Sequence, residues 1–232
     1  MPTRQTPEVL SLQTHRRIVG TLGLLLPAMI YVLAGVRPTA GLARWHVLWS
    51  VSAYYYTGAI GVFVGILFAL SLFLFSYRGY KGVLADRIVG AVGGLAAVVV
   101  ALFPTAAPAG LAEPTWWSEA TATIHYAAAV VLFVSFILFA IWLFRKSETS
   151  DRRHRPPDKR RRDAVCLACG LVMIVCVLWA AIAKVETKPI FWPESIAIFA
   201  FAVSWLVKGE AHEPVLRAAA KLMRGVGAPP GG

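Results

Sequence analysis

Side chains able to bind a polar group or to move a proton gather in three short stretches of the sequence. They are RWHVLWSVSAYYYTG, EPTWWSEATATIHY and KVETKPIFWPES. Their imidazole, carboxylate and hydroxyl groups can fix the polar part of a ligand, and the neighbouring aromatic rings suit its apolar part. We expect an aromatic and acidic pocket for a lipid or another small amphipathic ligand, bounded by His46, Ser52, Tyr55, Trp117, Glu119, His125 and Glu194.

The same stretches contain the residue types of a catalytic zinc site. Two histidines and a carboxylate can hold zinc and leave its fourth position to water. His46, His125 and Glu194 supply these groups, with Glu119 as a second choice of carboxylate. No H-x-x-x-H or H-E-x-x-H spacing sets two of these ligands on one helix, so three separate segments would have to converge. We therefore expect no cofactor, and a zinc-dependent lipid hydrolase at the outer leaflet is the alternative function.

The elements that position these residues are apolar and long. The chain is 58% hydrophobic and only 15% charged, whereas soluble domains carry roughly 25% charged residues. Each apolar stretch meets the length of about 17 to 25 residues that crosses a bilayer as a helix. They are residues 18–36, 57–75, 88–106, 124–144, 164–183 and 190–207. The sequence predicts an all-α transmembrane bundle of six spans over residues 18–207, with an N-terminal segment 1–17 and a tail 208–232 that can form an amphipathic helix.

The basic residues predict the orientation of this bundle. Of the 23 Lys and Arg residues, 19 lie in the segments before the first span, after the second, after the fourth and after the sixth. The alternate loops hold the other 4. Because Lys and Arg are enriched in cytoplasmic loops, both termini and the loop 145–163 are predicted to be cytoplasmic, in a bacterial inner membrane.

The densest basic run, DRRHRPPDKRRRD at residues 151–163, follows this rule. Nucleic-acid binding would need basic residues interleaved with aromatic rings on a folded surface, and this run has only His154 and the proline pair 156–157, which favours an extended linker. We expect no nucleic-acid partner. Contact with anionic lipid headgroups is the better second role, made by Arg152, Arg153, Arg155, Lys159, Arg160, Arg161 and Arg162.

Small residues within the spans suggest packing more than chemistry. Cys166 and Cys169 form a C-x-x-C pair, but a second cysteine pair and the strand-to-helix setting of a thioredoxin-type site are missing. The glycine runs GAIGVFVG and VGAVGG give faces on which helices approach closely. A structural or assembly role, including a homo-oligomer, is the second alternative function.

Several segments also carry a resemblance. YYYTGAIGVFVGILFALSLFLFSYRGY, ALFPT, IHYAAAVVLF and ESIAIFAFAVSWLVKGE resemble a group of small bacterial multi-pass membrane proteins without an assigned activity. More distantly, they are similar to the six-span FRAG/DRAM/SFK group of membrane proteins. The resemblance implies a helical membrane architecture and transfers no catalytic residues.

Overall fold

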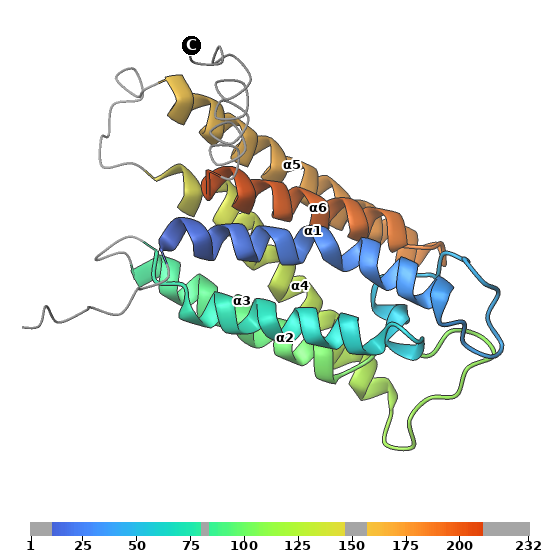
Figure 1. The fold of residues 1–232 in the computed structure, drawn as a ribbon. Helices are drawn as coiled ribbons and strands as arrows, with labels where there is room; N and C mark the ends of the chain where they lie inside the picture. The colour runs from blue at the N-terminus through green and yellow to red at the C-terminus, as the bar shows by residue number, and fades with distance from the viewer. Residues whose placement is uncertain (1–10, 80–83, 147–156, 211–232) are drawn as a thin grey trace, which may run out of the picture.

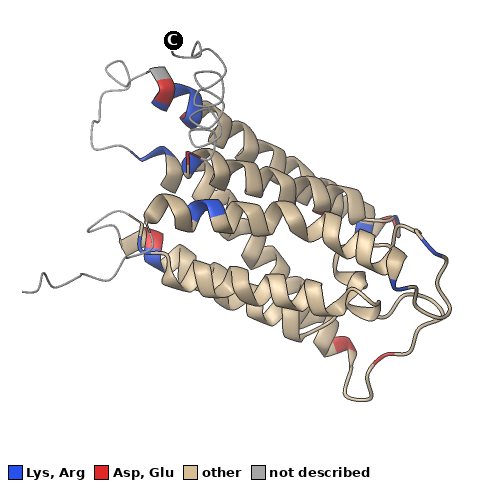
Figure 2. Ribbon diagram, viewed as in Figure 1, with Lys and Arg blue, Asp and Glu red and all other residues tan. Residues whose placement is uncertain are grey.

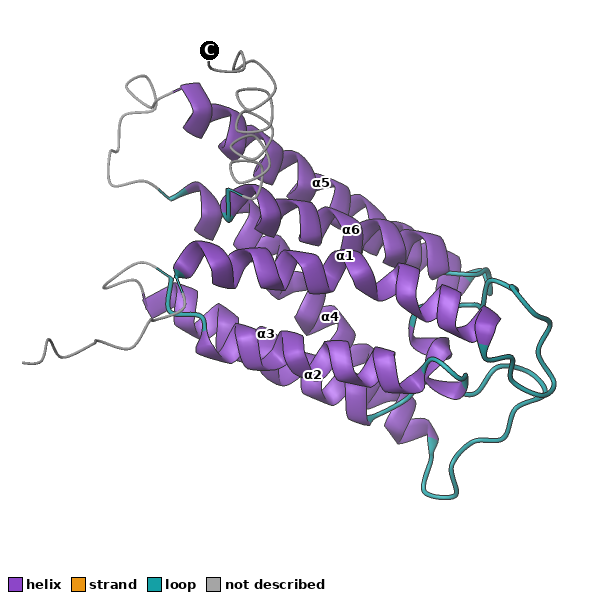
Figure 3. Ribbon diagram, in the orientation of Figure 1, coloured by secondary structure: helices purple, strands orange, loops and turns teal. Residues whose placement is uncertain are grey.

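The computed structural model describes residues 11–79, 84–146 and 157–210. These residues form α-helices and two short 3₁₀ helices and contain no strand (Figures 1 and 3), which confirms the all-α prediction. In chain order the elements are α1 (Leu12–Val36), η1 (Ser52–Tyr56), α2 (Ile60–Ser76), α3 (Leu84–Leu102), α4 (Glu119–Ile141), η2 (Leu143–Arg145), α5 (Pro157–Val185) and α6 (Phe191–Lys208).

The six α-helices form a closed ring in which each helix packs against its neighbours in the sequence. α1 contacts α2, α2 contacts α3, and so on to α6, which packs back against α1. α4 also touches α6 across the ring. Because neighbouring helices run in opposite directions (Figure 1), the starts of α2, α4 and α6 meet at one end of the bundle.

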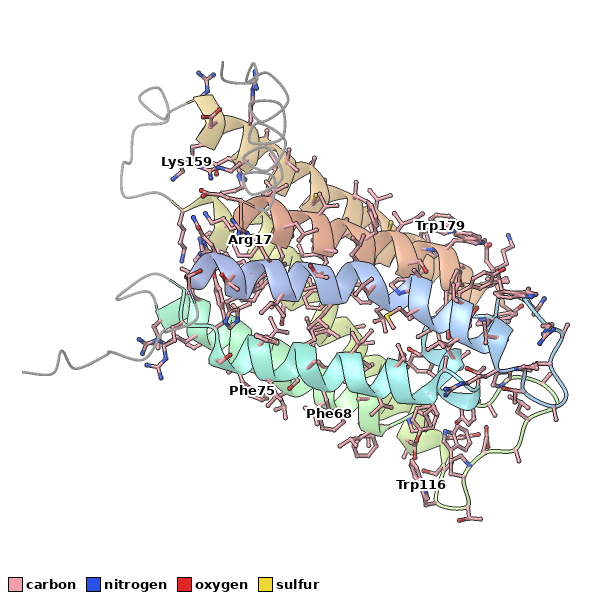
Figure 4. All side chains as sticks on the ribbon, viewed as in Figure 1. Arg17, Phe68, Phe75, Trp116, Lys159 and Trp179 are labelled. Atoms are coloured by element: carbon pink, nitrogen blue, oxygen red, sulfur yellow. The ribbon has the colours of Figure 1, made fainter. Side chains whose placement is uncertain are left out.

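The helices have the length and composition of membrane spans. Five of them, α1, α3, α4, α5 and α6, are long and apolar enough to cross a bilayer. α2 has 17 residues, or about 26 Å at 1.5 Å per residue, slightly less than a hydrocarbon core of about 30 Å. Phe68 and Phe75 of α2 and Trp179 of α5 project outward from the ring (Figure 4). Large apolar side chains exposed on the outer surface of a helical ring are typical of a multi-pass membrane protein.

Four helices, α1, α3, α4 and α5, begin earlier in the chain than the predicted spans, and the difference is greatest for α1 and α5. α1 begins at Leu12, where the Ser11 hydroxyl accepts a hydrogen bond from the Thr14 amide at 3.1 Å and caps the helix. α5 begins at Pro157, inside the loop predicted for residues 145–163. Proline is favoured in the first turn of a helix because its missing N–H would have no partner there. The prolines that we read as a sign of an extended linker therefore include one that starts a helix.

One end of the bundle, which we call the basic end, carries most of the Lys and Arg residues (Figure 2). α1, α3 and α5 begin there, and α2, α4 and α6 end there. The buried Arg16 guanidinium donates to the Tyr77 hydroxyl at 2.9 Å and lies over the rings of Tyr77 and Phe144. The Trp205 ring packs against both of these rings. The opposite end, which we call the loop end, is formed by residues 37–59, 103–118 and 186–190.

The glycines of α3 allow α2 to approach closely, whereas those of α2 face open space. A Cβ atom on Gly90 would lie 2.7 Å from the Leu74 carbonyl oxygen, and one on Gly94 would lie 3.0 Å from the Ser71 carbonyl oxygen. A Cβ atom on Gly61 or Gly65 would meet nothing within 4 Å. The VGAVGG run therefore packs inside the ring, and the α2 glycines lie on its outer surface.

This difference predicts opposite effects of the same substitution. Gly90→Ala places a methyl group against backbone that cannot move aside, so we expect a loss of about 1–3 kcal/mol of stability. Gly61→Ala adds a methyl group in open space and a better helix former, so its stability should be unchanged or raised by up to about 1 kcal/mol. Thermal unfolding of the detergent-purified variants measures both. Equal melting temperatures for the two variants would contradict this packing.

Candidate functional site

The segment of residues 48–57 folds back into the loop end of the bundle. Leu48, Val51, Ala53 and Tyr54 are buried, although most of this segment is not α-helical. The Trp49 carbonyl accepts hydrogen bonds from the amides of Ile190 at 2.7 Å and Phe191 at 2.9 Å. The first amides of a helix have no hydrogen-bond acceptor within the helix. The Trp49 carbonyl supplies that acceptor at the start of α6 and thereby holds the segment against α6.

Glu194 makes the second connection between this segment and α6. Its Oε2 atom accepts a hydrogen bond from the Val51 amide at 2.7 Å. Glu194 follows Pro193 in the first turn of α6, where both residue types are favoured by the exposed amides and the helix dipole. The carboxylate thus supplies an acceptor for a buried backbone amide outside any regular helix.

His125 joins the segment to α4 and to the end of α3. Its side chain is buried, with only 1% of the residue exposed. The Nδ1 atom lies 2.6 Å from the Phe103 carbonyl oxygen, and the Nε2 atom lies 2.9 Å from Ser52 Oγ. A carbonyl oxygen can only accept, so Nδ1 carries the proton, and in the neutral imidazole Nε2 accepts from the Ser52 hydroxyl.

Two aromatic side chains donate hydrogen bonds to backbone carbonyls of the loop that follows α3. The Tyr56 hydroxyl donates to the Thr105 carbonyl at 2.6 Å, and the Trp117 indole donates to the Pro104 carbonyl at 3.2 Å. Burial raises the pKa of Tyr56 to about 12, and the negative charge of Glu113 adds to this rise. Tyr56 is therefore a neutral donor throughout the physiological pH range.

Several hollows border this part of the molecule, and three of them are lined by Ser52, by Glu194 or by residues next to Ser52 in the chain. The outer cavity, of about 470 Å³, lies between the loops and is lined by residues that include His46, Trp49, Ser50, Ala53 and Tyr126. The lateral fissure, of about 200 Å³, lies between α4, α5 and α6. The inner cavity, of about 50 Å³, lies within the ring and is lined mainly by Leu, Ile, Val and Phe together with Ser52 and Glu194.

The lateral fissure has apolar walls and a charged end. Its walls include Ala129, Val130, Phe133, Val177 and Ala181. Lys184, Glu194 and Tyr126 line it too, and the Lys184 ammonium group lies over the Tyr126 ring. A cation over an aromatic ring gains roughly 0.5–2 kcal/mol of attraction, depending on its desolvation. The fissure therefore combines space for an apolar chain with an end that holds one basic and one acidic side chain, Lys184 and Glu194.

The structure brings together only part of the predicted binding set. His125 and Glu194 bond to adjacent residues of the buried segment, His125 to Ser52 and Glu194 to the Val51 amide. His46 is exposed at the rim of the outer cavity, and Glu119 is exposed at the first residue of α4. Tyr55 is half-buried, and its ring lies beside the Tyr56 ring. Trp117 is also half-buried, and its indole N–H donates to the Pro104 carbonyl.

The residues proposed for zinc do not form a ligand group. In the part of the chain that the structure describes, no three or more His, Cys, Asp and Glu side chains are placed to hold a metal ion. His125 has both ring nitrogens engaged, with Ser52 and with the Phe103 carbonyl, and His46 is exposed elsewhere in the loops. The geometry favours metal-independent uses of His125.

Two residues that line the fissure were not among the predicted site residues. Lys184 and Tyr126 line the fissure with Glu194, but the sequence alone does not say that α4, α5 and α6 are neighbours.

Cys166, Cys169 and Cys176 are buried as free thiols. Among the basic residues assigned to headgroups, Arg152, Arg153 and Arg155 lie outside the described residues, whereas the remaining four begin α5, where Arg162 pairs with Glu210.

The hydrogen bond to Val51 predicts that Glu194 holds the buried segment in place. Glu194→Ala leaves the Val51 amide without its acceptor, at a cost of about 1–3 kcal/mol. Hydrogen–deuterium exchange of residues 48–56 should therefore become roughly tenfold faster, since 1.4 kcal/mol is a factor of ten. Glu194→Gln retains an acceptor oxygen and should restore slow exchange, and Glu119→Ala, at an exposed site, is the control. Unchanged exchange in Glu194→Ala would argue against this anchor.

Comparison with known proteins places the chain in a family. A family model described as a protein of unknown function (DUF998) matches residues 48–209, a range that contains Ser52, His125 and Glu194. No curated protein and no solved structure matches the chain. Because the matched range covers more than half of the 232 residues, the chain belongs to the DUF998 family.

Proposed function

We propose that this membrane protein binds one anionic amphipathic molecule, with its apolar chain in the lateral fissure and its charged group at Lys184. The observation that carries this proposal is the fissure itself, which has apolar walls from three helices and a lysine at one end. A groove of this kind on the side of a membrane bundle is in contact with acyl chains, and a lysine near the interface attracts an anionic headgroup.

The outer cavity is a weaker candidate for the same ligand. It is larger, but it lies among the loops, away from the apolar surface of the bundle, and its lining is more polar. Glu194 reaches the fissure as well as the inner cavity. The proposed site therefore keeps Glu194 from the predicted aromatic and acidic pocket and replaces His46 and Glu119 with Lys184 and Tyr126.

We place the basic end in the cytoplasm of a bacterium, with the protein in the inner membrane. Support comes from the strong excess of Lys and Arg at this end (Figure 2) and from the rule that such residues remain on the cytoplasmic side. Lys159, Arg160 and Arg161 in the first turns of α5 then face anionic headgroups of the inner leaflet. The fissure, near the loop end, opens toward the outer leaflet.

Cysteine labelling tests this orientation. Thr115→Cys lies on the loop end and Arg160→Cys on the basic end, and both positions are exposed. A membrane-impermeant maleimide added to intact spheroplasts should label Thr115→Cys, whereas Arg160→Cys should react only after the membrane is opened. The three native cysteines are buried, so the unsubstituted protein is the background control. The reverse pattern would invert the proposed orientation.

Filling the fissure tests the ligand site. Ala181→Trp places an indole in the fissure, whereas Leu178→Trp adds the same ring to an exposed position of α5 outside it. In native mass spectrometry of delipidated protein titrated with phosphatidylglycerol, we expect Ala181→Trp to weaken the first binding step at least tenfold. Leu178→Trp should bind as the unsubstituted protein does. Equal affinity in the two variants would exclude the fissure as the site.

A further inference from the structure

Ser52 and His125 have the geometry of a nucleophile and its general base. The hydroxyl oxygen lies 2.9 Å from Nε2, within the reach needed for proton transfer. The Phe103 carbonyl holds the opposite nitrogen at 2.6 Å and thereby fixes the tautomer that leaves Nε2 unprotonated. A hydroxyl, a base and a third group that orients the base are the recurring components of an activated serine.

Burial of His125 disfavours the charge that it would acquire as a base, and the carbonyl end of α3 offsets part of this cost. Phe103 directly follows α3, which ends at Leu102, so the Nδ1–H group points at the carbonyl end of this helix. The C-terminal end of a helix carries the negative end of its dipole and stabilises a nearby cation. An imidazolium formed at this position would be stabilised by the last carbonyls of α3.

Ser52 lies between an apolar space and a polar one. It lines the inner cavity, and its neighbours Ser50 and Ala53 line the outer cavity. Ala129, Phe133 and Glu194 line both the inner cavity and the lateral fissure, so these three side chains form the wall between the two. A displacement of Phe133 would connect the fissure with Ser52. The serine can thus meet an amphipathic molecule that passes from the fissure into the inner cavity, and the outer cavity, on the side from which water would come, begins at the next residue, Ala53.

We infer that Ser52 and His125 form an acyl-transfer site that acts on a carboxylic ester of an amphipathic molecule, with water as the acceptor. The inference rests on the proposed function for the route by which the ester arrives. It does not depend on a metal ion, because the base is an imidazole and the nucleophile is a hydroxyl.

The steps balance without any oxidant or reductant. Ser52 Oγ bonds to the carbonyl carbon of the ester while its proton passes to His125 Nε2, and the carbonyl oxygen takes up the electron pair. The C–O bond to the alcohol portion then breaks, and this leaving group takes the proton from His125. Water next attacks the acyl group on Ser52 and gives a proton to His125. Collapse of this second intermediate releases the carboxylic acid and returns the proton to Ser52 Oγ.

Covalent labelling tests the nucleophile directly. The purified protein, in detergent and with its folded state checked by thermal unfolding, is incubated with an alkyl fluorophosphonate and digested for mass spectrometry. We expect the phosphonyl adduct on Ser52. Labelling should be lost in Ser52→Ala, fall at least 100-fold in rate in His125→Gln, and persist in Ser71→Ala, which removes a buried serine of α2 outside the site. A folded, unsubstituted protein with no adduct on Ser52, or labelling that survives Ser52→Ala, would overturn the inference.

Turnover and lipid binding separate this inference from the proposed function. Hydrolysis of p-nitrophenyl octanoate should fall at least 100-fold in Ser52→Ala and stay within about twofold in Ser71→Ala. If Ser52 is labelled but phosphatidylglycerol does not bind in the fissure, the acyl-transfer site stands and the lipid site is wrong. If phosphatidylglycerol binds in the fissure and Ser52 is neither labelled nor required for hydrolysis, the lipid site stands and the acyl-transfer site is wrong.

Discussion

The structure of the loop end depends on hydrogen bonds to the backbone N–H and C=O groups of one segment that is buried without being α-helical. Within a membrane protein, irregular backbone is tolerated only where protein or enclosed water supplies its hydrogen bonds. Residues 48–57 meet this requirement through α6, because Trp49 accepts from the first amides of that helix and Val51 donates to Glu194. Tyr56 then connects the same segment to the loop after α3. The positions of α3, α4 and α6 at this end are consequently linked through one short stretch of chain.

The Ser52–His125 hydrogen bond connects the segment to α4, but it satisfies no backbone group of the segment. His125 already satisfies the Phe103 carbonyl through Nδ1, and neither side chain bonds to an amide of the buried segment in the hydrogen bonds described. Burying an imidazole and a hydroxyl is costly, and their mutual hydrogen bond returns only about 1 kcal/mol net. An apolar side chain in place of Ser52 would leave the Phe103 carbonyl bonded to His125 and would fill the same space. The Ser52 hydroxyl on the oriented imidazole is therefore the feature of this site that structure alone explains least and chemistry explains best.

The sequence predicted the helices well because each apolar run is long. It also predicted that Ser52, His125 and Glu194 lie at the same end of the bundle, because consecutive helices run in opposite directions. It could not predict the direction of each side chain around its helix. Glu119 and His125 are six residues apart in α4, which is about 240° at 100° per residue, so one is exposed and the other is buried. The roles of Lys184 and Tyr126 depend on α5 lying beside α4 and α6, and no local pattern encodes that arrangement.

The two ends of the bundle use polar residues for different purposes, and this limits where a ligand can act. At the basic end the cations are held by protein: Arg16 by Tyr77 and two aromatic rings, and Lys208 by the Phe144 carbonyl. Trp205 and its aromatic neighbours fill the space between them. At the loop end the hollows remain, and the outer cavity, the fissure and the inner cavity all approach the segment that contains Ser52. Ser52 lines the inner cavity, which shares Phe133 and Glu194 with the fissure, and Ser50 and Ala53 on either side of Ser52 line the outer cavity. The routes from the side of the bundle and from the loops therefore both lead toward this serine.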